Sequence, residues 1–216
     1  MINSERTEAY LDSLDRGNTD FLNELEEYAH TTNVPIIRRP TQSLIRFMLA
    51  LNKPGSILEV GTAIGFSAIL MAQYSKEDAH ITTIEKYEKR IPIAKDNFEK
   101  SGFADKITLL EGDAQDILKI LADESNTYDF IFMDAAKGQY MNFLPMVKTL
   151  MKKGSLLISD NVLQDGDIIE SRFAVTRRNR TIHSRMREYL FTLTHDEDFV
   201  TEILPIGDGV ALSVKK

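Results

Sequence analysis

The sequence predicts an α/β fold in which a doubly wound parallel sheet follows a set of N-terminal helices. From Ser56 onward, short apolar runs with strand character alternate with helical segments, as expected for right-handed crossovers with helices on both faces of a sheet. Before Ser56, apolar residues recur at helical spacing instead. The chain has 216 residues, of which 43% are hydrophobic, which is enough for one sizeable core. We therefore expect a single domain over 1–216, with a helical cap at 1–55 and a core at 56–216.

Three helices are expected before the sheet. Apolar residues at helical spacing indicate a first helix around 10–14 and a second around 21–28. The sequence Asn18-Thr19-Asp20 supplies N-cap residues for the second helix. A third helix is expected at about 41–51, because prolines precede it and Lys53-Pro54-Gly55 breaks the chain after it.

The core is predicted to contain five strands that alternate with helices, followed by a less regular C-terminal part. The five strands are expected at 56–60, 80–84, 106–110, 128–133 and 155–159, with helices at 66–74, 87–101, 114–121 and 140–151. A long arginine-rich helix is then expected at about 168–194. Two closing strands follow at 199–204 and 209–214, and Gly207-Asp208-Gly209 between them indicates a hairpin.

Composition narrows the class of protein. The absence of cysteine excludes disulfides, thiolate catalysis and cysteine-based zinc sites, and is consistent with a cytoplasmic protein. No apolar run approaches the roughly 20 residues needed to cross a bilayer, and no signal peptide is expected, because the N-terminus lacks a basic start followed by an apolar stretch. The net charge of −7 argues against general affinity for nucleic acid.

One segment departs from this acidic balance. Between 171 and 189 the chain carries six arginines and one acid, Glu188, for a local charge of +5. The arginines are Arg172, Arg177, Arg178, Arg180, Arg185 and Arg187. Such a segment is often a solvated helix face, but it can also steer a polyanion to one side of the molecule.

Polar residues follow two of the predicted strands. Asp134 comes directly after 128–133, and Asp160-Asn161 follows 155–159. Neighbouring parallel strands would bring these three oxygen ligands to one carboxyl edge, where they would form part of a shell for Mg²⁺. Lys137 lies three residues after Asp134, within reach of a substrate oxygen bound at such a site. The pattern predicts metal-assisted chemistry on a substrate hydroxyl, with Asp134 and Lys137 as catalytic residues.

A second group of residues follows the first three strands. The turn after 56–60 reads Glu59-x-Gly61-x-x-x-Gly65 and opens a helix, so that glycine allows close backbone approach to a ligand. Glu85 ends the second strand, where a carboxylate can accept the hydroxyls of a ribose, and Asp113-Ala114 follows the third. A dinucleotide site would have G-x-G-x-x-G. The acids at the ends of these strands suit a cationic nucleoside better than the pyrophosphate of a dinucleotide. S-adenosylmethionine, a sulfonium, is such a ligand.

These motifs together resemble the class I, Mg²⁺-dependent O-methyltransferases, the family of the catechol and caffeoyl-CoA O-methyltransferases. The resemblance rests on the two site regions above, on Gly112-Asp113-Ala114 and on Asp134-Ala-Ala-Lys137-Gly-x-Tyr140, and it extends from about Pro35 to the end of the chain. Ile-Gly-Phe-Ser67 and the ending Pro-x-Gly-Asp-Gly209 look most like the bacterial tRNA 5-hydroxyuridine methyltransferases within that family.

The resemblance implies a Rossmann-like sheet of seven strands, with the last strand antiparallel to the rest, and a homodimer. It implies that Glu85 binds the ribose of S-adenosylmethionine and that Asp113 and Ala114 border its adenine. It also implies that Ser67 and Asp134 lie near the methionine end and that Ile37 borders the cofactor. The metal ligands would be Asp134, Asp160 and Asn161.

The acceptor is left open by the site chemistry, because a catechol and 5-hydroxyuracil both offer two neighbouring oxygens. The arginine-rich segment 172–187 favours a tRNA partner, whose anticodon loop would be methylated to 5-methoxyuridine. The alternative is a small catechol or caffeoyl-CoA-like acceptor. A nucleotide-binding module without catalysis and an NAD-dependent dehydrogenase are further alternatives, and the acid at Glu59 argues against the dehydrogenase.

Overall fold

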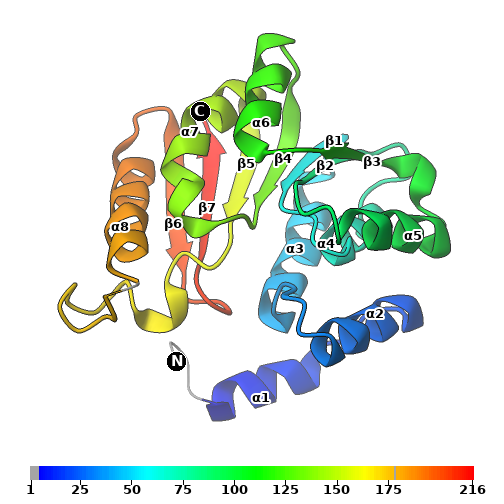
Figure 1. Ribbon diagram of the computed structural model, residues 1–216, viewed down its shortest axis with the longest axis horizontal. Helices are drawn as coiled ribbons and strands as arrows, with labels where there is room; N and C mark the ends of the chain where they lie inside the picture. The colour runs from blue at the N-terminus through cyan, green and yellow to red at the C-terminus, as the bar shows by residue number, and fades with distance from the viewer. Residues whose placement is uncertain (1–4, 178) are drawn as a thin grey trace.

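The computed structural model describes residues 5–177 and 179–216, and its centre is a seven-stranded sheet (Figure 1). The strand order is β3-β2-β1-β4-β5-β7-β6. The strands are β1 Ser56–Val60, β2 His80–Glu85, β3 Ile107–Glu111, β4 Tyr128–Met133, β5 Met151–Ser159, β6 Phe199–Leu204 and β7 Val210–Lys215. The order reverses direction at β1, so the chain winds away from the centre of the sheet on both sides.

The strand directions confirm the predicted sheet. β1 pairs in parallel with β2 and β4, while β2–β3 and β4–β5 are also parallel pairs. β7 is antiparallel to both of its neighbours, β5 and β6, so the last strand of the chain runs against the rest. β6 and β7 form the hairpin that Gly207 and Gly209 indicated, and both glycines have positive φ.

Helices cover both faces of the sheet, and each face has its own apolar core. α4 (Phe66–Tyr74) and α5 (Ile91–Ser101) lie on the same face as the N-terminal helices. α6 (Ala114–Asp123), α7 (Tyr140–Leu150) and α8 (Arg180–His195) cover the other face. Figure 1 shows the two groups on opposite sides of the sheet. β1 and β4 are buried along nearly their whole length, as expected for strands that are covered on both faces.

The N-terminal cap consists of α1 (Glu5–Leu14), α2 (Asp20–Thr31) and α3 (Arg39–Asn52). Leu22, Leu25, Ile45 and Leu49 of α2 and α3 are buried in the core on the α4 side. α1 is different, because its apolar residues Tyr10, Leu11 and Leu14 are all more than half exposed.

The prediction of a helix over about 168–194 was wrong for its first part. α8 begins only at Arg180, and the described residues before it, 168–177 and 179, form turns and bends and no helix. Poor helix formers such as Val175 and Thr176 weaken helical hydrogen bonding there. The backbone carbonyls of Ile168 and Glu170 are bonded instead by side chains of α8, Arg187 and His183. Of the predicted arginines, Arg178 lies outside the described residues.

Candidate active site

A cavity of about 580 Å³ opens at the carboxyl ends of β1 to β5. Its walls include residues that follow each of these strands, and the segment 35–38 of the cap closes one side. The volume is typical of a site for a cofactor and a small substrate. Seven of the nine residues predicted to bind the cofactor line it: Ile37, Gly61, Ser67, Glu85, Asp113, Ala114 and Asp134. We call the side after β1, β2 and β3 the cofactor end, and the side after β4 and β5 the metal end.

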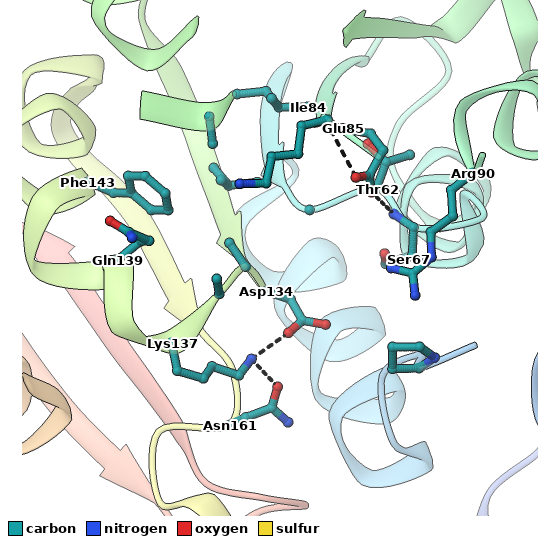
Figure 2. A pocket seen from close by; sticks show the side chains of 18 of the residues that line it. Thr62, Ser67, Ile84, Glu85, Arg90, Asp134, Lys137, Gln139, Phe143 and Asn161 are labelled. Atoms are coloured by element: carbon teal, nitrogen blue, oxygen red, sulfur yellow. Dashed lines mark hydrogen bonds and ion pairs between the residues drawn. The ribbon is translucent and has the colours of Figure 1, made fainter. Parts of the chain in front are cut away.

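Glu85 at the end of β2 is the most firmly held side chain of the cofactor end. Its Oε2 accepts a hydrogen bond from the backbone N–H of Ala63 at 2.7 Å. Its Oε1 accepts from the N–H groups of Lys86 at 2.9 Å and Tyr87 at 2.8 Å. Figure 2 shows Glu85 at the cavity wall, so its carboxylate faces the cavity in one orientation. This arrangement suits an acceptor for ribose hydroxyls.

The glycine turn after β1 is required by packing around it. Gly61 has φ of 108°, and a Cβ there would lie 2.3 Å from the carbonyl oxygen of Asp134. Gly65 precedes α4 with φ of 89°, and a Cβ there would lie 2.5 Å from the ring of Phe98. The glycines therefore let this turn pass close to β4 and α5. Gly65 does not line the cavity itself.

Glu59 lies behind the cavity wall and does not line it. The side chain is fully buried, and its Oε2 accepts a hydrogen bond of 2.5 Å from the hydroxyl of Thr83. Burial raises the pKa of Glu59 to about 7, because the charged form is poorly solvated there. Glu59 therefore bonds the neighbouring strand β2 from behind the cavity wall.

Asp113 has a structural partner as well as a place in the cavity wall. It is the N-cap of α6, where its Oδ1 accepts from the N–H of Gln115 at 2.9 Å. This hydrogen bond, together with one from Lys86, lowers the pKa of the Asp113 carboxyl, so it remains ionised. Lys86 also lines the cavity, although the sequence analysis assigned it no role.

At the metal end, Asp134 and Asn161 converge on one point. The Lys137 ammonium donates to Asp134 Oδ1 at 2.7 Å and also to Asn161 Oδ1 (Figure 2). Lys137 lies in the 3₁₀ turn Lys137–Gln139, which begins just after β4 and is followed directly by α7. The sequence prediction that these residues meet at one sheet edge is therefore matched by their positions.

Asp160 lies beside this point but beneath the surface. It is 1% exposed, and its Oδ1 accepts from the N–H of Asn161 at 2.9 Å and from the hydroxyl of Thr41 at 3.4 Å. Among the residues that the structure describes, Asp160 Oδ2 has no hydrogen-bond partner. Burial and the nearby charge of Asp134 raise the pKa of Asp160 to about 7.

These donors fit a hard divalent cation. Two carboxylates and an amide oxygen are the ligand types that Mg²⁺ prefers, and a buried carboxylate oxygen without a partner is costly unless a cation or proton joins it. The point between Asp134 and Asn161 already receives a positive group, the Lys137 ammonium. The residues that would hold the cation are Asp134, Asp160 and Asn161.

Two residues for which the sequence indicated no supporting role at the metal end lie behind it. Tyr140, at the start of α7, has its hydroxyl 3.0 Å from the carbonyl oxygens of both Met133 and Asp160. Arg185 of α8 donates to the carbonyl of Gly138, next to Lys137, at 2.9 Å. Tyr140 belongs to a sequence motif described above, but its role depends on contacts that spacing along the chain does not reveal.

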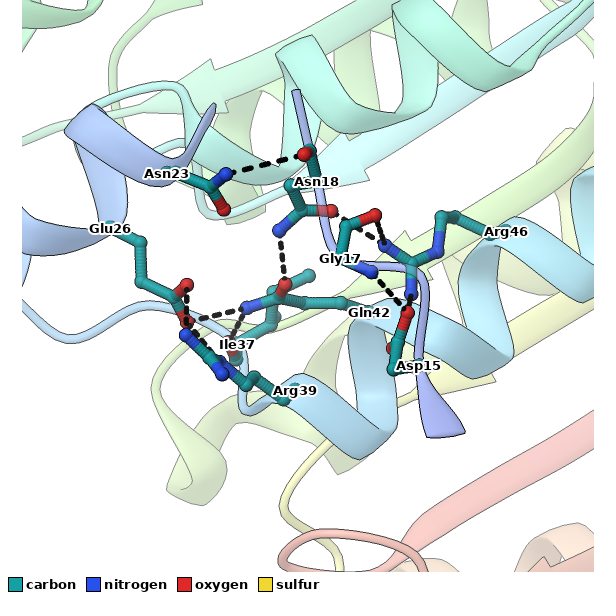
Figure 3. Close-up of polar contacts among 9 residues, drawn as sticks. All are labelled: Asp15, Gly17, Asn18, Asn23, Glu26, Ile37, Arg39, Gln42 and Arg46. Atoms are coloured by element: carbon teal, nitrogen blue, oxygen red, sulfur yellow. Dashed lines mark hydrogen bonds and ion pairs between the residues drawn. The ribbon is translucent and has the colours of Figure 1, made fainter. Parts of the chain in front are cut away.

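The cap reaches the cofactor end through a buried polar network (Figure 3). Gln42 of α3 is 1% exposed, and its Nε2 donates to the carbonyl of Ile37 at 2.9 Å and to Glu26 Oε1 at 3.3 Å. Its Oε1 accepts from Asn18 Nδ2 at 2.7 Å. Because Ile37 lines the cavity, this network positions one wall of the site from within the cap.

The arginine-rich segment is only partly available for a partner. Arg185 and Arg187 donate to backbone carbonyls of Gly138 and Ile168. Arg172 and Arg177 are exposed in the turns before α8, and Phe173 beside them is 84% exposed.

The fold and the site define a class of enzyme. A carboxylate at the end of β2, a glycine turn after β1 and a cavity at the carboxyl edge of a doubly wound sheet are features of nucleoside-cofactor enzymes with a Rossmann-like fold. The seven-stranded order with an antiparallel last strand places this chain among the methyltransferases of that class.

Comparison with known proteins gives the family. The family model described as O-methyltransferase matches residues 12–216, and the chain belongs to this family of enzymes. Caffeoyl-CoA O-methyltransferase 1 of Arabidopsis thaliana is 31% identical over 191 residues, which cover 85% of this chain and 72% of the plant protein. A catechol O-methyltransferase of Niastella koreensis is 32% identical over 133 residues, covering 61% of this chain and 60% of its own.

Solved structures agree with this assignment. A Staphylococcus aureus protein, provisionally described as a caffeoyl-CoA O-methyltransferase, has a TM-score of 0.89 and 33% identity, over 99% of this chain and 100% of its own. The S-adenosylhomocysteine-bound methyltransferase PaMTH1 of Podospora anserina has a TM-score of 0.88 and 27% identity, over 98% of this chain and 94% of its own. Among the described residues, no helix is long and apolar enough to cross a membrane.

Proposed function

We propose that this O-methyltransferase moves the methyl group of S-adenosylmethionine to one of two neighbouring oxygens of a small catechol-like or caffeoyl-CoA-like acceptor. The observation that carries the proposal is the convergence of Asp134, Asn161 and Lys137 within one cavity that also contains Glu85. A cation site and a nucleoside site would then lie at opposite ends of the same cavity. The catechol and caffeoyl-CoA relatives support the acceptor class.

The cofactor end would bind the methyl donor. Glu85 would accept ribose hydroxyls, while Asp113 and Ala114 would border the adenine. Ile37 and Ser67 line the cavity between the cap and α4, where the methionine part would lie beside Asp134. S-adenosylhomocysteine in the Podospora relative supports this ligand.

The metal end would orient the acceptor. A divalent cation held by Asp134, Asp160 and Asn161 would supply Lewis acidity, which lowers the pKa of a hydroxyl. Lys137 contacts two of these residues. In its neutral form, its amine would accept the proton that leaves the acceptor hydroxyl. The acceptor oxygen then forms the new C–O bond as the C–S bond breaks. Gln139 and Phe143 line the same part of the cavity and would contact the acceptor.

A second candidate acceptor is 5-hydroxyuridine in the anticodon loop of tRNA. The observation that favours it is the exposed Arg172, Phe173 and Arg177, which follow the metal-end turn in sequence. Cationic and aromatic side chains of this kind bind phosphates and stack on splayed bases. The homodimer expected from the family resemblance likewise remains a prediction.

The test is transfer of labelled methyl groups from S-adenosylmethionine to a simple catechol, to caffeoyl-CoA and to bulk tRNA that carries 5-hydroxyuridine, each with and without EDTA. We expect the label to appear in a small acceptor. This labelling should be lost when EDTA is added and in the Asp134→Ala variant. Label in tRNA alone, decreasing steeply with added salt, would replace the small acceptor by the RNA. No label in any acceptor, together with intact S-adenosylhomocysteine binding, would contradict both candidates.

A further inference from the structure

Tyr140 joins the two strand ends that carry the predicted metal ligands. Its ring is 1% exposed, and its hydroxyl lies 3.0 Å from the carbonyl oxygen of Met133 and 3.0 Å from that of Asp160. Met133 directly precedes Asp134, so one hydroxyl contacts the backbone of the chain at both ligand-bearing turns. The backbones of the two turns are also joined by the hydrogen bond from the N–H of Asp160 to Met133 O, at 3.0 Å.

The same hydroxyl also contacts the predicted catalytic amine. Lys137 Nζ lies 3.3 Å from Tyr140 Oη and donates to it. A phenol has one proton and can also accept, so it can donate to one of the two carbonyls while it accepts from the ammonium. Tyrosine is the residue type that provides this combination on a rigid ring. Phenylalanine would keep the packing and lose all three contacts.

Packing alone does not account for a tyrosine at this position, and a neighbouring tyrosine provides the comparison. The ring of Tyr189 in α8 is also fully buried and meets the ring of Tyr140 edge to face, with centroids 5.3 Å apart. The hydroxyl of Tyr189 lies 2.6 Å from Ser159 Oγ, beneath the turn, and has no contact with Asp134, Asn161 or Lys137 in the described hydrogen bonds. The two tyrosines are therefore equally buried, but only the hydroxyl of Tyr140 contacts the residues of the metal end.

We propose that Tyr140 is a positioning residue for the divalent cation: its hydroxyl sets the spacing between the Asp134 turn and the Asp160 turn and fixes Lys137 beside them. The inference rests on the proposed function, because it requires a cation at the metal end. Residues behind metal ligands commonly influence affinity in this way, and their loss typically costs 10–100-fold.

The experiment is isothermal titration calorimetry, in which Mn²⁺ alone is added to the metal-free protein. It compares the wild type with Tyr140→Phe and Tyr189→Phe. We expect the Kd for Mn²⁺ to rise about tenfold in Tyr140→Phe. In Tyr189→Phe it should stay within about twofold, because that hydroxyl is outside the metal end. S-adenosylhomocysteine affinity should be unchanged in both variants, since the cofactor end does not contact either phenol.

Equal Mn²⁺ affinity in wild type and Tyr140→Phe would overturn the inference, and so would an equal loss in both variants. If the wild type itself bound no Mn²⁺, the proposed function would fail at the metal end. Should Tyr140→Phe not fold, wild-type protein with ¹³Cζ-labelled tyrosine provides the test. The resonances of the other buried tyrosines, Tyr128 and Tyr189, are identified by their loss in Tyr128→Phe and Tyr189→Phe. Mg²⁺ is then expected to shift the remaining buried resonance, that of Tyr140, and the absence of this shift would overturn the inference.

Discussion

The cofactor end and the metal end of the cavity are built by different means. At the cofactor end, Glu85 is held by three backbone N–H groups from residues close to it in sequence or in the adjacent glycine turn. At the metal end, side chains hold one another: Lys137 bonds Asp134 and Asn161, while Thr41, 119 residues away along the chain, bonds Asp160. Backbone groups remain in place when a side chain is changed, whereas a side-chain network loses several contacts at once. A single substitution at the metal end should therefore disturb several residues of the site, whereas one at the cofactor end should disturb fewer.

The largest effect is expected for Asp134→Ala. The variant loses a predicted ligand and a partner of Lys137, and metal-ion stabilisation of several kcal/mol corresponds to a drop in methyl transfer on the order of 10³-fold. S-adenosylhomocysteine affinity should fall far less, because Glu85 remains in place. Single-turnover transfer and calorimetry on the same preparation measure the two effects. A variant with near-normal turnover would exclude Asp134 from the catalytic site.

Glu85→Gln is the reverse experiment at the cofactor end. Replacing the charged acceptor by an amide should raise the Kd for S-adenosylhomocysteine roughly 10–100-fold, because hydrogen bonds to charged groups contribute about 1.5–3 kcal/mol. Mn²⁺ affinity should be unchanged. Asp116→Asn, an acid in the first turn of α6 that does not line the cavity, serves as the matched control. Loss of Mn²⁺ binding in Glu85→Gln would show that the two ends are not independent.

Glu59→Gln should change how stability depends on pH. Burial raises the pKa of Glu59 to about 7 in the folded chain, above its ordinary value of 4.5. Between these values the folded protein binds the extra proton, so the free energy of unfolding falls as pH rises from about 4.5 to about 7. The glutamine variant lacks this fall and should gain on the order of 2–3 kcal/mol relative to wild type between pH 5 and pH 8. Urea unfolding at both pH values measures it, and parallel pH profiles would contradict the assignment.

Among the variants expected to change ligand binding, Gln42→Met should have the smallest effect. It leaves the carbonyl of Ile37 and the amide of Asn18 without their partner, which should lower the free energy of unfolding by roughly 1–3 kcal/mol. S-adenosylhomocysteine affinity should fall only a few-fold, since the cap forms one wall of the cofactor end. Asn23→Ala, which removes an exposed hydrogen bond to Asn18 in the same network, is the control. A larger loss in the control would place the important contact elsewhere in the cap.

Local patterns were sufficient for most of the sheet. The bounds of β1, β4 and α4 match the sequence prediction. The two strands are short, mostly apolar runs between turn residues, which is typical of strands buried on both faces. The start of the arginine-rich helix was predicted about twelve residues too early. In the segment before α8, backbone carbonyls that a helix would use internally are bonded by the side chains of His183 and Arg187. A periodicity argument cannot anticipate such bonds.

The sequence by itself determined which residues can meet at the carboxyl edge, because parallel strands place residues that follow them side by side. It thereby identified Glu85, Asp134, Lys137 and Asn161 as neighbours of one cavity. Only the tertiary structure decided that Glu59 and Gly65 lie behind the cavity wall. It also decided that Asp160 is buried beside Thr41. The contacts of Tyr140 with the turns that follow β4 and β5 likewise depend on the tertiary structure. The physical reason is that burial and side-chain hydrogen bonds depend on packing between segments far apart in the chain, which local spacing does not encode.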